Sequence, residues 1–210
     1  MARTEPFDKY IGEYENWFKE NYFAYESEVE AVRHFIPYNK KGIEIGIGTG
    51  RFAVPLNIKE GIEPSVVMRD YSLRLGLTVY KGVAEKLPLE DKSYDFALMI
   101  TTICFVDDAR KAFREVSRIL KPGGCLIIGF VDRNSLLGKI YEKMKKQNKF
   151  YRYATFYATD EVKKILQEHK FKNVEIIQTV FGELSEIHNI QLFKEGYGEG
   201  GFVVIKAERI

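Results

Sequence analysis

The stretch Glu44-Ile45-Gly46-Ile47-Gly48-Thr49-Gly50 decides the fold. It completes a short β-branched run, residues 42–47, and opens a segment, residues 50–57, that we expect to be a short helix. Glycines at a strand-to-helix turn are typical of a nucleotide-binding loop, because they let the backbone turn tightly and approach a ligand without a Cβ clash. The stretch therefore predicts an α/β domain with a ligand at this turn, the alternative being a structural turn with no ligand.

The spacing of the glycines distinguishes between two ligand classes. A dinucleotide-binding loop would carry its third glycine at position 51, which is Arg51, whereas here that glycine is Gly50. The resulting E-x-G-x-G-x-G pattern resembles the first motif of class I S-adenosylmethionine-dependent methyltransferases. The resemblance implies that this loop wraps the amino-acid part of S-adenosylmethionine, and the acidic Glu44 suits an α-ammonium group. A nicotinamide-dependent oxidoreductase is the least favoured hypothesis, because Arg51 occupies the position of its third glycine.

A second acidic residue, Glu63, ends the next expected strand, nineteen residues after Glu44. A carboxylate at this place can accept hydrogen bonds from both hydroxyls of a ribose. Dinucleotide enzymes use the same device, so Glu63 indicates a nucleoside without selecting its class. A solvated loop acid is the alternative interpretation.

The resemblance extends over about residues 7–131 and is closest to the ubiquinone/menaquinone-biosynthesis-type (methyltransferase type 11) family. Residues 82–89 with 93–95 look like the family's adenine-contacting loop, residues 120–124 match the turn before its fifth strand, and residues 157–171 resemble its last helix. The aromatic segment 7–18 is similar to the part that caps the cofactor in relatives. The chain departs from the family at Val83, where relatives usually have an acid that contacts the adenine amino group. Glu85 is the candidate to replace that acid here. The cofactor-binding residues that the resemblance implies are Glu44, Gly46, Ile47, Gly48, Gly50, Glu63, Pro64, Val83, Ala84, Glu85 and Thr101.

Strand and helix patterns alternate along the chain and predict a Rossmann-like, doubly wound sheet of seven strands, mostly parallel, with an antiparallel C-terminal hairpin and a helical cap. We expect one domain over 1–210, with an N-terminal helical lid segment at 1–37 and a cap insertion at 134–157. Strands are expected at 42–47, 58–63, 77–81, 95–100, 125–131, 174–180 and 202–207. Helices are expected at 10–35, 50–57, 65–75, from Asp107 or Asp108 to about residue 120, and 159–169.

Composition limits the protein class. The chain has 210 residues, 45% of them hydrophobic, a net charge of +2 and only two cysteines. These values predict a globular domain with neither a disulfide framework nor strong attraction to nucleic acid. The first eight residues lack the apolar core of a signal peptide, and the longest apolar run is too short to span a bilayer. We therefore expect a soluble cytoplasmic protein.

The sequence does not single out a catalytic residue. Methyl transfer needs a general base only where the acceptor must lose a proton, and positioning supplies much of the rate. Asp107 and Asp108 are better interpreted as helix caps, and Cys104, between apolar neighbours, as a buried hydrophobe. Asp132 and Arg133 follow the fifth strand without a clear role, and no metal-ligand spacing is present. His34, His169 and His188 are isolated and suit surface or helix-end positions.

Acceptor specificity is expected in the insertion 134–157. One helical face there is apolar, five lysines mark much of the rest, and aromatic residues follow. The simplest interpretation is a cap helix with a solvated basic face. Alternatives are a basic rim for an anionic acceptor, or a patch for RNA or an anionic membrane. A small-molecule acceptor is favoured, the other hypotheses being an RNA-modifying methyltransferase and a non-catalytic S-adenosylmethionine-binding module; the acceptor atom and the oligomeric state stay open.

Overall fold

Eight strands form one mixed sheet in the computed structural model, which describes residues 3–210. The sheet order is β3-β2-β1-β4-β5-β8-β6-β7. Strands β1 to β5 pair in parallel, β8 lies antiparallel between β5 and β6, and β7 pairs antiparallel with β6. The strands are β1 (Gly42–Ile45), β2 (Glu60–Ile62), β3 (Thr78–Tyr80), β4 (Tyr94–Ile100), β5 (Leu120–Val131), β6 (Phe171–Thr179), β7 (Lys194–Glu195) and β8 (Phe202–Arg209).

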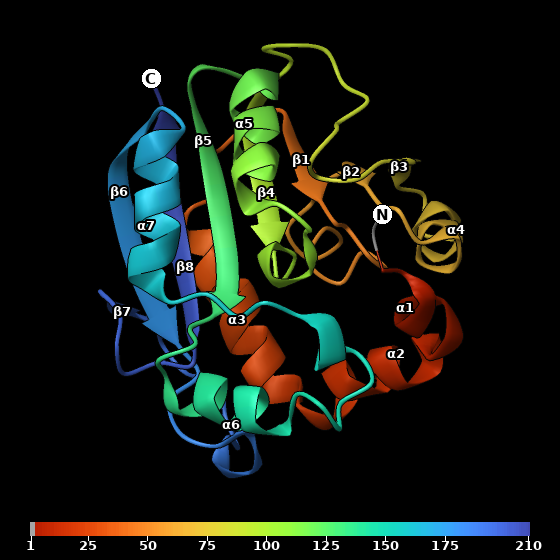
Figure 1. Ribbon diagram of the computed structural model, residues 1–210, viewed down its shortest axis with the longest axis vertical. Helices are drawn as coiled ribbons and strands as arrows, with labels where there is room; N and C mark the ends of the chain where they lie inside the picture. Colours follow the sequence, from red (N-terminus) through yellow and green to blue (C-terminus); the bar gives the residue numbers. More distant parts are fainter. Residues whose placement is uncertain (1–2) are drawn as a thin grey trace.

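Helices cover both faces of the sheet (Figure 1). On one face α5 and α7 pack against the strands, and on the other α3 and the segment 52–58 do so. Helices α1, α2 and α6 gather beyond the arrowheads of β4 and β5, at the carboxyl edge of the sheet (Figure 1). The helices are α1 (Glu5–Lys9), α2 (Ile11–Glu20), α3 (Tyr22–His34), α4 (Val66–Arg74), α5 (Ala109–Ile119), α6 (Leu136–Met144) and α7 (Thr159–Glu168), with short 3-10 helices η1 (Ile103–Phe105), η2 (Tyr151–Tyr153) and η3 (Leu184–Glu186).

The predicted fold class is confirmed, and the strand count differs by one. The structure adds β7, which extends the sheet beyond β6 at its edge. Two exposed residues carry no alternation of polar and apolar side chains, so the sequence holds no signal for this strand. The C-terminal antiparallel pair is present as predicted, with β8 in register with both β5 and β6.

The predicted continuous helix over residues 10–35 is wrong, because α2 and α3 are separate. The break lies at Asn21, whose backbone N–H and side-chain amide both donate to the carbonyl of Trp17. Asparagine side chains compete in this way with the helical hydrogen-bond ladder. A further short helix, α1, precedes them inside the predicted lid segment, whose first two residues lie outside the described residues.

The predicted helix over residues 50–57 is also wrong, since this segment forms consecutive turns. Pro55 has no N–H, so the ladder between the bonds Val54–Gly50 and Leu56–Phe52 is interrupted. The carbonyl of Arg51, which Pro55 leaves free, instead accepts a hydrogen bond from the Tyr25 hydroxyl on α3. The segment after the glycine loop is therefore fixed by tertiary contacts.

The predicted caps of two other helices are confirmed. The Ser65 hydroxyl accepts a hydrogen bond from Met68 N at the start of α4. Of the two acids before α5, Asp108 is the cap, because its carboxylate accepts from Lys111 N. Both helices therefore begin where the sequence indicates.

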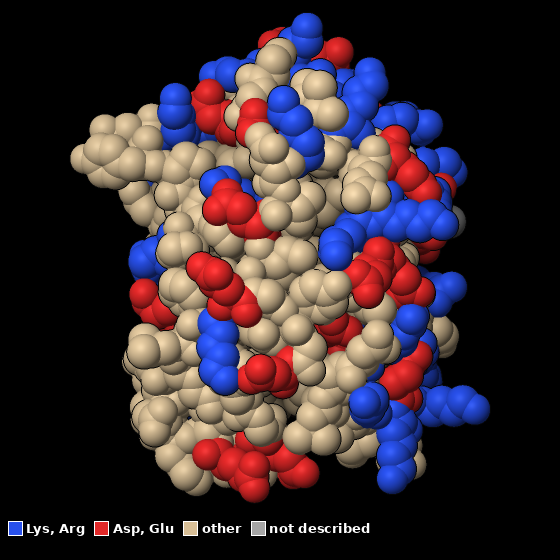
Figure 2. Space-filling view, turned by 90° about the vertical axis from the view of Figure 1, so that its left-hand side faces the viewer, with Lys and Arg blue, Asp and Glu red and all other residues tan. Residues whose placement is uncertain are grey.

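Charge on the side of the molecule near β6 and β7 is mixed. Lys and Arg are interspersed there with Asp and Glu (Figure 2). Several of these charges form exposed ion pairs, among them Lys194–Glu199 and Lys206–Glu175. This side does not present the single-sign surface that non-specific nucleic-acid binding uses.

Candidate functional site

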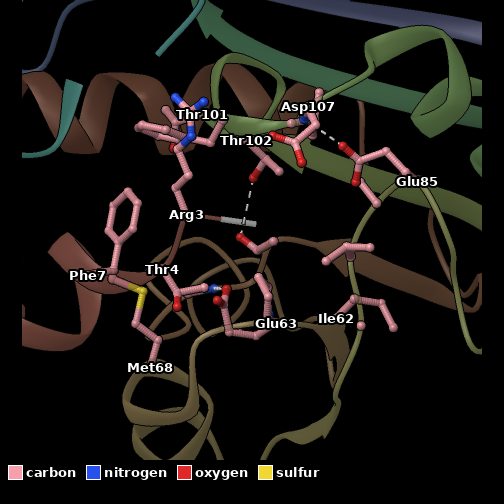
Figure 3. A pocket seen from close by; sticks show the side chains of 18 of the residues that line it. Arg3, Thr4, Phe7, Ile62, Glu63, Met68, Glu85, Thr101, Thr102 and Asp107 are labelled. Carbon is pink, nitrogen blue, oxygen red and sulfur yellow. Dashed lines mark hydrogen bonds between the residues drawn. The ribbon is translucent and has the colours of Figure 1, made fainter. Parts of the chain in front are cut away.

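A first cavity, the loop pocket, lies at the carboxyl ends of β1, β2 and β4, with a volume of about 110 Å³. In Figure 3 Arg3 and Phe7 lie on the opposite side of the pocket from Ile62 and Glu85, with Thr4 and Glu63 between them. Open α/β sheets bind ligands at this edge. The residues predicted from the sequence that line it are Gly46, Gly48, Glu63, Pro64, Val83, Ala84, Glu85 and Thr101.

Two glycines of the loop adopt a backbone conformation that side chains disfavour. Gly46 has φ 76° and Gly48 has φ 55°. A Cβ on Gly46 would lie 2.4 Å from Thr102 Oγ1, and one on Gly48 would lie 3.3 Å from Tyr14 Oη. The loop therefore needs glycine both for its turn and for the close approach of neighbouring groups.

The Glu63 carboxylate is held rigidly at the floor of the loop pocket. Its Oε2 accepts from Gly48 N at 2.9 Å and its Oε1 accepts from Ser65 N at 2.8 Å. Burial raises the pKa of this carboxyl to about 7, against the opposing effect of those two backbone hydrogen bonds. Each carboxylate oxygen keeps capacity for a further hydrogen bond, which fits the two vicinal hydroxyls of a ribose.

Glu44 lies behind the loop and lines neither this cavity nor the larger one described below. Its side chain is buried, and a hydrogen bond from the Ala53 backbone opposes a pKa that burial and the nearby Glu63 charge raise. Its Oε2 has no hydrogen-bond partner among the described residues. Ile47 and Gly50 likewise lie outside the pocket wall, so these three predicted residues support the loop from behind.

Glu85 has a structural partner that the sequence did not indicate. Its Oε1 accepts from the backbone N–H groups of Asp107 at 2.6 Å and Asp108 at 3.2 Å. The dashed line between Glu85 and Asp107 in Figure 3 marks the shorter bond. One oxygen of the predicted adenine-contacting acid is thus engaged in tying the 83–85 loop to the start of α5.

A second cavity, the aromatic chamber, adjoins the loop pocket and has a volume of about 700 Å³. That volume lies within the range of about 300–1,000 Å³ usual for small-molecule sites. Its walls come from α1, α2, α3, η2, the end of β5 and the cap. The wall residues include Trp17, Phe18, Glu28, Phe52, Tyr141, Phe150 and Tyr151.

Four residues line both cavities: Phe7, Tyr14, Thr101 and Phe105. Thr101 is β-branched and yet has φ 50°, a conformation that costs about 1–3 kcal/mol and is found mainly at functional sites. Burial and the charges of Glu63, Glu44 and Glu15 raise the pKa of the Tyr14 phenol, so it stays a neutral donor at the junction. The two cavities therefore meet at a defined boundary.

The N-terminal segment is fastened to the glycine loop and to the cap. Glu15 on α2 pairs with Arg51 and accepts from the Thr49 hydroxyl, and Asp8 accepts from the Ser65 hydroxyl at 2.6 Å. Lys149 Nζ of the cap lies 2.6 Å from a Glu13 carboxylate oxygen. The Phe7 and Phe150 rings, 5.6 Å apart, contact one another above the boundary between the cavities. The predicted lid segment and cap insertion thus touch each other.

Other candidate residues have structural roles. Asp132 is buried and accepts from Thr159 Oγ1 and Asn134 N. Burial raises the pKa of the Cys104 thiol to about 12, and its Sγ lies 3.3 Å from the Thr101 carbonyl. His34 and His169 lie at helix ends, and His188 is exposed. Within residues 3–210, no cluster of three metal-ligating side chains occurs.

Glu28 is a residue of the chamber that the sequence reasoning missed, whereas Trp17 belongs to the aromatic segment 7–18 identified above. Glu28 does carry a signal, because it lies on the same face of α3 as Ala24, Ala31 and Val32, at spacings of three and four. A carboxylate inside an apolar helical stripe is unusual, since charged side chains are rarely buried unless paired.

The sheet order, the glycine loop and the carboxylate after β2 define a Rossmann-like nucleoside-binding enzyme of the methyltransferase class. A methyltransferase domain family model matches residues 43–128. The crystal structure of an S-adenosylmethionine-dependent methyltransferase of Thermotoga maritima, described as a possible histamine N-methyltransferase, matches with a TM-score of 0.96 at 50% identity, over 99% of this chain and 100% of that one.

Two sequence relatives are similar over most of the chain. An uncharacterized protein of Methanocaldococcus jannaschii is 46% identical over 97% of this chain and 98% of its own length. Demethylmenaquinone methyltransferase of Staphylococcus aureus is 25% identical over 70% of this chain and 74% of its own length. The chain belongs to the S-adenosylmethionine-dependent methyltransferases. In the described part of the chain, every helix is too short or too polar to cross a bilayer.

Proposed function

We propose that the loop pocket binds the adenosyl part of S-adenosylmethionine and that the aromatic chamber holds a small-molecule methyl acceptor. The observation that carries this proposal is the shared boundary at Phe7, Tyr14, Thr101 and Phe105. A donor in one cavity and an acceptor in the other would have their reacting ends at this boundary. Placing two reactants so is the main catalytic requirement of an in-line displacement.

The residues of the loop pocket fit this cofactor. The Glu63 carboxylate would accept hydrogen bonds from the ribose hydroxyls, and the backbone at Gly46 and Gly48 leaves room for the methionine part. Ile62, Met68 and Val83 provide apolar surface for the adenine ring. Glu44, behind the loop, would act on the α-ammonium only through the loop, because its side chain does not reach the pocket.

S-Adenosylmethionine, held by the loop pocket through Glu63 and the Gly46–Gly48 backbone, would supply an electrophilic methyl group to the acceptor's lone pair and would leave as S-adenosylhomocysteine. The protein would contribute positioning and the exclusion of water. The rings of Phe7, Phe105 and Phe150 pack together at the boundary, and the Tyr14 hydroxyl stays neutral there. A proton on the acceptor atom would leave to water or to an acid within the chamber.

A small molecule is favoured over RNA as the acceptor. The chamber is enclosed by rings from separate segments, and two of the five cap lysines are paired with acids, Lys145 with Glu142 and Lys149 with Glu13. The Thermotoga protein, half identical in sequence, makes histamine and other small amines the first acceptors to test.

Calorimetry against S-adenosylhomocysteine, S-adenosylmethionine and NAD tests the cofactor, and a methyl-transfer screen tests the acceptor. We expect both sulfur ligands to bind and NAD not to bind. Binding of NAD alone would overturn the proposal. Cofactor binding with turnover only on RNA would select the RNA-modifying alternative, and cofactor binding without turnover on any acceptor would select the non-catalytic module.

A further inference from the structure

Glu28 is a buried carboxylate without a partner. Its side chain lies in the wall of the aromatic chamber and is only 4% exposed. Among residues 3–210 no hydrogen bond or ion pair to its carboxylate is present, and burial is the sole cause of its pKa shift. Burial raises the pKa of this carboxyl to about 8. Burying such a group without compensation is expensive, so it is normally paired or functional.

The chamber around Glu28 is suited to a cation. Its described wall contains three glutamates, Glu13, Glu20 and Glu28, and neither lysine, arginine nor histidine. Glu13 is already paired with Lys149 of the cap, so the acidic side chain available to a ligand deep in the chamber is Glu28. The Tyr141 and Tyr151 rings stack with centroids 5.0 Å apart. Burial raises the pKa values of both phenols, and the Glu28 charge adds a smaller effect in the same direction. Aromatic faces attract cations, and more strongly when water is excluded.

We propose, on the basis of the function proposed above, that the aromatic chamber selects a small molecule with a protonated amine and that Glu28 is its anchoring counter-ion. The ammonium would receive the carboxylate on one side and the aromatic wall at Tyr141 and Trp17 on the others. Tyr151, stacked between Phe105 and Tyr141, holds that wall in place. Binding of the ammonium would ionise Glu28, with release of its proton to water, whereas an acidic or neutral acceptor of the same size would gain no such charge pair and would bind more weakly.

The anchoring point is separate from the reacting point. Glu28 lines only the aromatic chamber, whereas Tyr14 and Thr101 line both cavities. An acceptor held by its ammonium at Glu28 would therefore present a different atom, with a free lone pair, to the methyl group at the boundary. This division matches the chemistry, because a protonated amine has no lone pair to accept a methyl group.

The test measures binding of 2-phenylethylamine, 2-phenylethanol and phenylacetate by calorimetry, with and without saturating S-adenosylhomocysteine. We expect wild-type protein to bind the amine at least tenfold more tightly than the alcohol, and not to bind the acid. Glu28→Gln should reduce the amine preference to less than threefold. The matched control is Glu30→Gln, which makes the same change on the surface of the same helix, where Glu30 pairs with Arg33; it should keep the full preference.

Equal binding of amine and alcohol by the wild type, no amine binding, or an undiminished preference in Glu28→Gln would each overturn the inference. A merely structural role for Glu28 would alter stability in the variant and leave the ratio of the two affinities unchanged. Failure of S-adenosylhomocysteine to bind would refute the proposed function instead, and the amine preference measured without it would still decide the role of Glu28.

Discussion

The loop pocket and the aromatic chamber are neighbours built in different ways. The loop pocket is formed mainly by short turns that each follow a parallel strand, so the sheet itself brings Gly48, Glu63 and Ala84 together. The chamber is formed by α1, α2, α3 and the cap, whose only common feature is that they cover the same edge of the sheet. Backbone geometry therefore dominates the first cavity, and side-chain identity dominates the second.

The largest expected effect tests the backbone side of this comparison. Gly48→Val should weaken S-adenosylhomocysteine binding at least 100-fold, about 3 kcal/mol. The valine would strain a backbone at φ 55° and place its Cβ where Tyr14 and the cofactor approach. Calorimetry measures the binding, and circular dichroism checks the fold.

Gly76→Val separates the strain from the loss of space. Gly76 has φ 82°, and a Cβ there would meet nothing within 4 Å. This control should be destabilised and yet bind the cofactor normally. Retained binding in Gly48→Val would show that the loop is only a structural turn.

The second largest expected effect concerns Glu63, the carboxylate that we propose to bind the ribose in the loop pocket. Glu63→Ala should weaken S-adenosylhomocysteine binding by about 2–3 kcal/mol, roughly 30- to 150-fold, because a charged partner for two hydroxyls is lost. Glu60→Ala is the control, because Glu60 is the first residue of the same strand and does not line the pocket; its carboxylate accepts a hydrogen bond from the Tyr94 hydroxyl. A dissociation constant that does not change in Glu63→Ala would place the ribose elsewhere.

The sequence predicted the two cavities unequally for the same physical reason. Glycine spacing and a carboxylate at a strand end are local signals, and Gly46, Gly48 and Glu63 were found from them. The chamber depends on which distant segments meet, and one sequence does not encode that locally. The break at Asn21 and the turns around Pro55 were missed although each has a local cause, the Asn21 amide bonded to the Trp17 carbonyl and the missing N–H of Pro55, because the apolar periodicity continues across both; the tertiary bond from Tyr25 to the Arg51 carbonyl then fixes the turns.

A third prediction concerns pH and the buried acid of the chamber. The pKa of Glu28 is about 8 in the folded protein, above that of an unfolded glutamate at about 4.3. Between these values the folded state holds a proton that the unfolded state has released, so stability falls as the pH rises through this window. From pH 6 to pH 8 Glu28 should lower the free energy of unfolding by about 2 kcal/mol. The groups that face it are phenols, Tyr25, Tyr141 and Tyr151, whose raised pKa values keep them neutral here.

Urea unfolding at pH 6 and pH 8 measures this change. Because other groups such as Glu63 also titrate, the informative quantity is the difference between variants. Glu28→Gln should lose less stability over this interval than the wild type, by about 2 kcal/mol, and Glu30→Gln should behave as the wild type. Identical changes in all three proteins would mean that Glu28 is already ionised at pH 6 in the folded state.

The smallest expected effect tests whether the two cavities act as one unit. The loop pocket, at about 110 Å³, is smaller than the roughly 300 Å³ at which ligand sites usually begin, and Arg3, Thr4 and Phe7 line it. These residues must shift outward to admit a nucleoside and close again over it. Since Phe7 contacts Phe150 and Glu13 pairs with Lys149, closure should order the N-terminal segment and the cap together.

Amide hydrogen exchange with S-adenosylhomocysteine bound measures this closure. Exchange should slow about tenfold, near 1.4 kcal/mol, in residues 10–23 and 136–157. Lys149→Ala should reduce the protection of the cap alone, by less than 1 kcal/mol, because the pair is exposed. Protection confined to residues 44–50, Glu63 and the 83–85 loop would show that both segments are static covers.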